Sequence, residues 1–158
     1  MITSRTYYKG EIQIDDVQDT APNSSVIGSG GVLDILIEKY ERDVLIKCLG
    51  HSLYKEFQTS LEVKEEAQGL QTLKSDAEQK WKDLLSGKEY TTKEGENVVW
   101  RGIIFKDGSF DRSFIANYVF CKYIKSDHYS VKVKPEKTKI MTPFLQYLSS
   151  WNEFQELV

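Results

Sequence analysis

The sequence predicts a mainly α fold, a compact bundle of about five helices with a small β-hairpin and extended arms. Three observations predict it. Apolar residues recur at steps of three and four over several stretches, which is the spacing of one helical face. β-branched and aromatic residues dominate one region, residues 88–105, which is expected to be the hairpin. The chain has 158 residues, so we expect a single domain over residues 1–158.

The strongest helical pattern lies in residues 32–61, which we expect to form a pair of helices. The opposite, charged face of the first helix includes Glu41, and Gly50 suits the left-handed position that ends a helix. Ser52 can cap a short second helix, which must bend sharply against the first. The polar residues 62–74 are expected to be a helical extension followed by a connection. The apolar face of the first helix in this pair consists of Leu33, Leu36, Ile37, Tyr40, Val44, Leu45 and Cys48.

Residues 75–86 are predicted to form a short helix with signals at both ends. Ser75 and Glu78 have the spacing of a capping box, in which each side chain accepts a free backbone N–H. Trp81 and Leu85 lie on its apolar face, and Gly87 is placed to end it.

Residues 111–126 are predicted to be the central helix, because they are apolar nearly all round. Asn117 lies within this run and needs a hydrogen-bond partner if it is buried. Residues 142–157 are predicted to be the last helix, whose aromatic face includes Trp151 and Phe154. A helix face of this kind most often packs in the core, but it could instead dock on a partner.

Residues 88–105 are predicted to form the β-hairpin, with its turn near Gly95. An isolated hairpin is barely stable in water, so it must pack on the helices or pair with another chain. Tyr90 and Val98 are therefore candidate contact residues. Gly102 would weaken a strand, and it indicates a bulge or a close backbone approach.

Two segments are predicted to be arms. Residues 1–31 are weakly patterned and form an N-terminal arm or loop, which could be mobile and dock on a neighbouring subunit. Residues 126–140 are rich in lysine and are expected to be either a solvated loop or a basic loop that touches DNA phosphates or an acidic partner. The candidate contact residues in this second arm are Lys132, Lys134, Lys137 and Lys139.

The composition of the chain and the motifs that it lacks limit the classes of function that the sequence predicts. A net charge of −3 gives no overall basic footprint for nucleic acid. Cys48 and Cys121 are predicted to be buried, reduced thiols, which favours a reducing compartment. No apolar run has the length of a membrane span, and no metal, nucleotide or nucleophile motif occurs. The sequence therefore predicts no catalytic residues, cofactor or metal, although a pocket lined by His51, Asn117 or buried carboxylates would indicate an enzyme.

The order of four segments resembles that of a family of small uncharacterised proteins encoded by phages and prophages of Bacteroidetes-type bacteria. These segments are residues 36–57 (LIEKYERDVLIKCLGHSLYKEF), 81–90 (WKDLLSGKEY), 100–103 (WRGI) and 113–123 (SFIANYVFCKY). More loosely, the layout resembles the helical head–tail connector (adaptor) proteins of tailed phages, which form rings under the portal. The resemblance covers residues 33–125 and brings no catalytic residues with it.

This resemblance implies a non-enzymatic structural virion component that forms a ring and contacts portal or tail proteins. It also implies localisation in the virion, and in the bacterial host cytoplasm during assembly. A weak contact with DNA phosphates is a further expectation, and no membrane contact is expected. The alternatives are a helical protein–protein binding module of bacterial origin, or an enzyme with an unrecognised site. The candidate subunit or partner contacts are Tyr90, Val98, Lys132, Lys134, Lys137, Lys139, Trp151 and Phe154.

Overall fold

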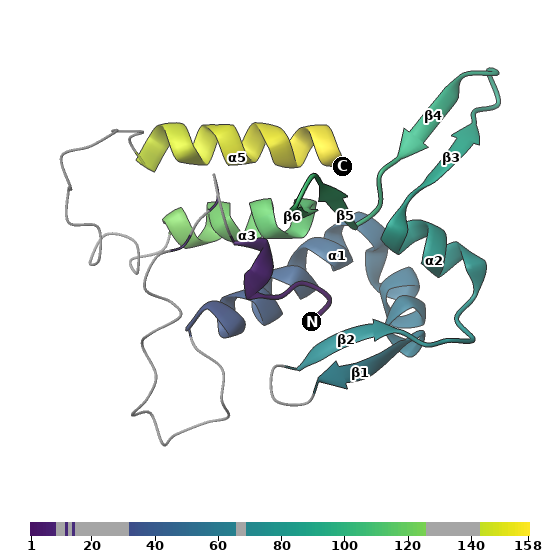
Figure 1. Cartoon of the computed structure of the whole chain (residues 1–158), viewed down its shortest axis with the longest axis horizontal. Coiled ribbons are helices and arrows are strands. Elements are labelled where there is room, and N and C mark those ends of the chain that lie inside the picture. The colour runs from purple at the N-terminus through teal and green to yellow at the C-terminus, as the bar shows by residue number, and fades with distance from the viewer. Residues whose placement is uncertain (9–11, 13, 15–31, 66–68, 126–142) are drawn as a thin grey trace.

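The computed structural model describes residues 1–8, 12, 14, 32–65, 69–125 and 143–158 (Figure 1). These residues form four α-helices, a short 3-10 helix and three two-stranded antiparallel sheets. Strands make up 21% of the described residues, so the prediction of a mainly α, five-helix bundle is wrong, and the fold is mixed α/β. In chain order the elements are η1 (Arg5–Tyr7), α1 (Val32–Thr59), β1 (Leu61–Glu65), β2 (Leu70–Leu73), α2 (Gln79–Ser86), β3 (Lys88–Thr91), β4 (Asn97–Trp100), β5 (Ile104–Asp107), β6 (Phe110–Ser113), α3 (Phe114–Lys125) and α5 (Pro143–Leu157).

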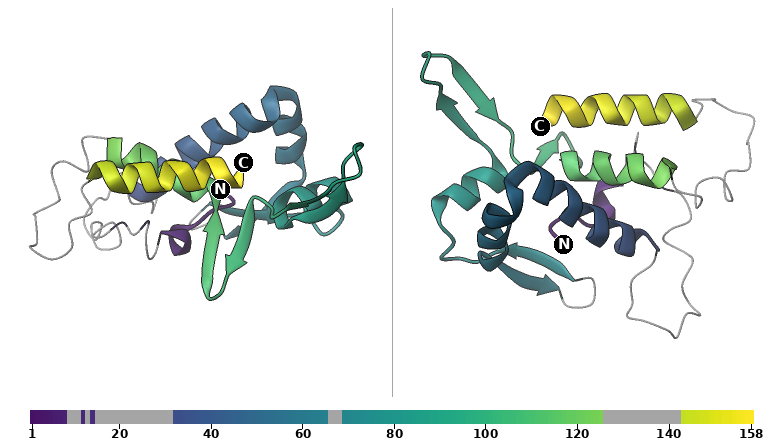
Figure 2. Two further views of the ribbon diagram at one scale, coloured as in Figure 1. Left: turned by 90° about the horizontal axis from the view of Figure 1, so that it is seen from above. Right: turned by 180° about the vertical axis from the view of Figure 1, so that it is seen from behind.

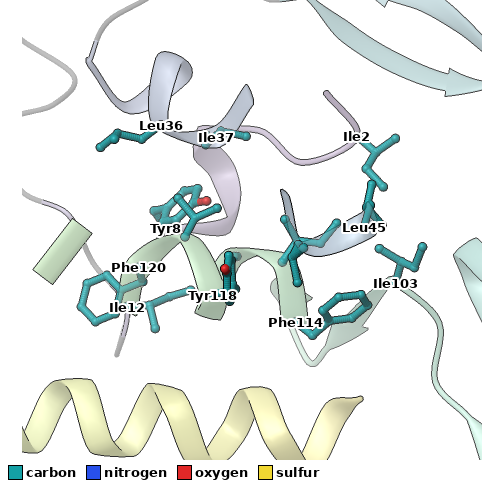
Figure 3. Close-up of a cluster of buried hydrophobic side chains, with 14 of the residues drawn as sticks. Ile2, Tyr8, Ile12, Leu36, Ile37, Leu45, Ile103, Phe114, Tyr118 and Phe120 are labelled. Carbon is teal, nitrogen blue, oxygen red and sulfur yellow. The ribbon is translucent and has the colours of Figure 1, made fainter. Parts of the chain in front are cut away.

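The body of the protein is a layer of helices in which α3 lies between α1 and α5 (Figures 1 and 2). Ile115, Ala116 and Val119 of α3 are completely buried, as expected for a helix that is apolar on nearly every side. Figure 3 shows side chains from α1, α3 and the N-terminal segment meeting in this core. The prediction of a central helix is confirmed, although α3 begins at Phe114 and not at residue 111.

The first helix bends at Gly50, as predicted. Gly50 has a φ of 75° and a ψ of 164°, a backbone conformation that residues other than glycine rarely adopt. The helix ends at Thr59, where the Ser60 N–H donates to the Phe57 carbonyl oxygen.

Residues 62–74 do not extend the helix, which corrects that prediction. Leu61–Glu65 and Leu70–Leu73 pair as the antiparallel hairpin β1–β2. The short period-two pattern of Leu61 and Val63 is obscured by the many charged residues around it, and the strand pairing decides the outcome. The outer edge of β2 is also covered, because the Gln71 N–H donates to the Met1 carbonyl oxygen at 2.6 Å.

Helix α2 begins at Gln79, later than the sequence predicts. Glu78 occupies the N-cap position without a side-chain hydrogen bond to the helix, so the predicted capping box is wrong. The Ala77 N–H instead donates to the Lys74 carbonyl oxygen, which closes a turn ahead of the helix. Burial of Trp81 and Leu85 and the helix end at Gly87 are confirmed.

Residues 88–113 form two hairpins where one was predicted. The hairpin β3–β4 has the predicted position, with Tyr90 opposite Val98. Residues 104–107 do not continue it, because the chain turns at Gly102 and β5 pairs with β6 instead.

The first residues belong to the body of this chain. Ile2, Thr3 and Tyr8 are buried, as are Ile12 and Ile14. The described part of the predicted arm over residues 1–31 therefore packs on its own chain.

Candidate interaction surface

The β3–β4 hairpin projects from the body and is fixed at its base by two glycines (Figures 1 and 2). A Cβ atom on Gly87 would lie 2.6 Å from the Trp100 carbonyl oxygen, and one on Gly102 would lie 2.6 Å from the Gly87 nitrogen. Both glycines have a positive φ, at 93° and 95°. The two chain segments thus cross at backbone-to-backbone distance, a packing that only glycine allows.

A single carbonyl group of α2 joins the helix to this crossing. The indole N–H of Trp100 donates to the Leu84 oxygen at 2.9 Å, and the Ile103 N–H donates to the same oxygen at 3.1 Å. The carbonyl groups in the last turn of a helix lack helical partners, so these bonds satisfy Leu84 while they attach the hairpin. These two bonds and the crossing of the glycines attach the hairpin to the body at its base.

Tyr90 and Val98, two of the predicted contact residues, lie together on one face of the hairpin. Directly opposite residues of an antiparallel pair share a face, so Lys88 and Trp100 lie on this face as well. The Tyr90 side chain is 50% exposed. Beside it is an open groove of about 440 Å³, which is lined by Lys80, Asp83, Leu84, Lys88, Tyr90 and Trp100.

The outer edge of β4 is unpaired within the described part of the chain. The Thr92 N–H donates to the Glu96 carbonyl oxygen, so these two residues form a hydrogen-bonded pair. Non-hydrogen-bonded and hydrogen-bonded pairs then alternate along the hairpin from that point. On this alternation, Asn97 and Val99 direct their N–H and C=O groups away from β3. β4 also carries no charged side chain, whereas lysine and other charges are what usually protect an exposed edge from pairing.

Trp151 and Phe154, two more of the predicted contact residues, turn toward the body. The Phe154 ring lies 5.5 Å from the Tyr118 ring and 6.1 Å from the Phe114 ring, both on α3. Trp151 packs against Phe154 at 5.2 Å. The aromatic face of α5 is therefore covered by α3. The remaining predicted contacts, Lys132, Lys134, Lys137 and Lys139, lie outside the described residues.

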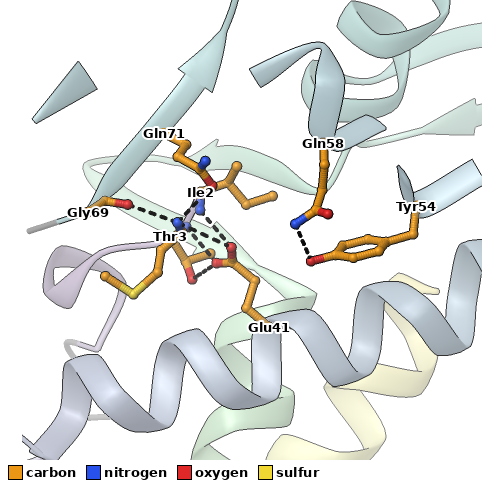
Figure 4. Close-up of polar contacts among 8 residues, drawn as sticks. Ile2, Thr3, Glu41, Tyr54, Gln58, Gly69 and Gln71 are labelled. Carbon is orange, nitrogen blue, oxygen red and sulfur yellow. Dashed lines mark hydrogen bonds and ion pairs between the residues drawn. The ribbon is translucent and has the colours of Figure 1, made fainter. Parts of the chain in front are cut away.

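Glu41, which the sequence pattern places on the charged face of the first helix, instead lies in a buried polar cluster (Figure 4). Its carboxylate accepts hydrogen bonds from the Ile2 N–H at 2.7 Å, the Thr3 N–H at 3.0 Å and the Thr3 hydroxyl at 2.7 Å. Desolvation raises the pKa of Glu41 above its ordinary value, against the opposing effect of these bonds and of the Met1 amine. The sequence contained a signal, since Glu41 lies four residues after Ile37 and four before Leu45, both buried. The cluster anchors the N-terminal segment to α1.

A second polar cluster lies at the surface between α1 and α3. The Tyr118 hydroxyl donates to Asp43 at 2.7 Å, and the Lys47 amine donates to Asp43 and to Tyr118, each at 2.9 Å. The hydrogen bond from Lys47, followed by that from Tyr118, lowers the pKa of Asp43. These three side chains are thus joined by hydrogen bonds that link α1 to α3.

His51 and Asn117, the residues that would indicate an enzyme if they lined one pocket, do not lie together in the structure. His51 is exposed and Asn117 is buried in the core, where its Oδ1 atom has no hydrogen-bond partner among the described residues. Cys121 is buried, which raises the pKa of its thiol to about 11, whereas Cys48 is exposed, contrary to the prediction. Within the ranges that the structure describes, no group of His, Cys, Asp and Glu side chains could hold a metal ion, and no helix is long and apolar enough to cross a membrane.

Comparison of this chain with protein-family models, with curated proteins and with solved structures finds no match.

Proposed function

We propose that this protein is a non-enzymatic structural subunit that assembles with further copies of itself through the β3–β4 hairpin. The observation that carries the proposal is the projection of this hairpin, whose outer β4 edge pairs with no other described strand (Figure 1). A two-stranded sheet is marginally stable in water, and a third strand or a second surface would stabilise it. Val99, which is 62% exposed, and Tyr90 offer apolar contact area on the two faces of the hairpin.

A contrast within the chain supports this use of β4. β2 also lacks charged side chains, but its outer edge is covered by Met1 of the same chain. The other described hairpin strands, β1, β3, β5 and β6, each carry charged residues. An unpaired, uncharged edge normally attracts another strand, and a projecting one favours intermolecular pairing.

The resemblance to phage proteins supplies the setting of the proposal. On the basis of this resemblance, we propose that the protein is a head–tail connector-like virion component of a tailed phage or prophage, with portal or tail proteins as partners. Ring subunits contact their neighbours through unlike surfaces, and the ring closes when the rotation between copies allows it. A projecting hairpin is suited to such a head-to-tail contact, because the hairpin of one copy can reach a different surface of the next.

Light scattering coupled to size-exclusion chromatography over a concentration series tests the proposal. Val99→Lys places a charge at the β4 edge and should shift the protein toward the monomer. Val63→Lys is the matched control, because Val63 is 57% exposed on β1, and it should assemble as the wild type does. A wild type that stays monomeric at every concentration, and also when mixed with a portal protein, would contradict the proposal. Equal assembly of both variants would show that another surface is used.

A further inference from the structure

A cluster of cations covers tyrosine rings on the surface between α1 and α3. The Lys39 amine lies 5.2 Å from the centre of the Tyr40 ring, and the Lys122 amine lies 6.0 Å from the same ring. Lys122 also lies 5.0 Å from the Tyr118 ring, and Lys47 lies 5.4 Å from it. We call this surface the basic face, and it consists of Lys39, Tyr40, Arg42, Asp43, Lys47, Tyr118 and Lys122.

The basic face carries four positive side chains and one negative one in a chain whose overall charge is −3. Asp43, the one carboxylate, already accepts hydrogen bonds from Lys47 and Tyr118. Lys39 and Arg42 are exposed to solvent, so their charge is available to a partner, whereas the Lys47 amine is paired with Asp43. A shallow hollow of about 380 Å³ opens on this face between Lys39, Tyr40, Arg42, Asp43 and Ile46. The face is therefore complementary to a partner of dense negative charge.

We propose that the basic face binds the phosphate backbone of duplex DNA. Lysine binds phosphate as a point charge, without the fixed geometry that the arginine fork requires. Lysine is also depleted in protein–protein interfaces. Tyr118 is only 4% exposed, so its ring is not open for stacking with an unpaired base. These features favour phosphates held without base contacts, and such binding carries no sequence preference.

Fluorescence anisotropy with a short labelled DNA duplex tests this assignment. The patch variant is Lys39→Gln/Lys122→Gln, and the matched control is Lys55→Gln/Lys64→Gln, which removes the same charge from exposed lysines on the far part of α1 and on β1. Titrations between about 50 and 200 mM salt give the slope of log affinity against log salt, whose magnitude is about 0.9 for each phosphate that the protein neutralises. We expect the patch variant to bind more weakly and to lower the slope by about 2. The control should match the wild type.

Three results would overturn the assignment. The wild type could fail to bind the duplex at the lowest salt concentration, or both double variants could weaken binding equally, which would show a response to net charge alone. Tighter binding of polyglutamate than of the duplex, abolished in the patch variant, would assign the face to an acidic protein. Circular dichroism of both variants checks that the helices are intact, so that weaker binding reports on the surface.

Discussion

Replacing Gly102 by alanine should destabilise the base of the β3–β4 hairpin. The new Cβ atom would lie 2.6 Å from three backbone atoms, the Gly87 nitrogen, the Leu85 oxygen and the Ser86 carbon. Backbone atoms of a helix end cannot rotate away as a flexible side chain can, so either the hairpin or the end of α2 must move. The hydrogen bonds of the Leu84 carbonyl oxygen, which join these two elements, would lengthen with that movement.

Gly95→Ala is the matched control for this substitution. Gly95 has a φ of 86°, close to the 95° of Gly102, but a Cβ atom there meets nothing within 4 Å. Both variants carry the backbone strain of a side chain at positive φ, about 1–3 kcal/mol. Only Gly102→Ala adds the cost of overpacking, about 1–3 kcal/mol. The difference between the two free energies of unfolding should therefore be about 1–3 kcal/mol.

Urea unfolding of both variants, followed by tryptophan fluorescence, measures this difference directly. For a chain of this length it corresponds to a difference in melting temperature of about 2–12 °C. Equal stability of Gly102→Ala and Gly95→Ala would refute the close backbone approach at the base of the hairpin. If the hairpin assembles the subunits, Gly102→Ala should also weaken assembly, because the hairpin would lose its fixed orientation.

Three further predictions concern the body of the protein. Glu41→Gln leaves at least one buried N–H without an acceptor and should lower the free energy of unfolding by about 1–3 kcal/mol. Because the folded pKa of Glu41 is raised above 4.5, the contribution of this carboxyl group to stability should be fully present below that value and lost as pH rises through the folded pKa. Urea unfolding across pH should find this trend in the wild type and not in the variant. Phe154→Ala should lower the free energy of unfolding, measured by thermal denaturation, by about 3–5 kcal/mol. Leu148→Ala, on the exposed side of α5, should lower it by under about 1 kcal/mol. Equal losses in the two variants would contradict the packing of the Phe154 side of α5 against α3. Trp100→Phe removes one of the two donors to the Leu84 oxygen and should cost about 0.5–1.5 kcal/mol in the same assay, while an unchanged melting temperature would count against that bond.

The sequence predicts those elements whose signals are local and long. The apolar spacing on either side of Gly50, the run that forms α3 and the alternation around Gly95 each depend on residues close together in the chain, and the structure confirms them. The close approach at Gly102 was also predictable, because a glycine inside a strand-like run usually marks a bulge or a place where two backbones meet.

The elements that were missed depend on contacts between distant residues. β2 pairs with β1 on one side and with Met1 on the other, and its own four residues contain no signal that predicts either partner. Glu41 is buried because Ile2 and Thr3, some 39 residues earlier, supply its hydrogen bonds. Of the candidate contact residues, Tyr90 and Val98 share a face because their strands pair, whereas Phe154 is partly buried against α3.

The position of α3 between α1 and α5 has a consequence for synthesis on the ribosome. The chain emerges from its N-terminus, so α3 is complete before α5, the helix that covers Phe114 and Tyr118, has been translated. Until then a strongly apolar helix has only one of its two helical neighbours, and such surfaces promote aggregation of nascent chains. The native helix layer can therefore close only after α5 has left the exit tunnel, and nascent chains stalled before Pro143 should need a chaperone to stay in solution.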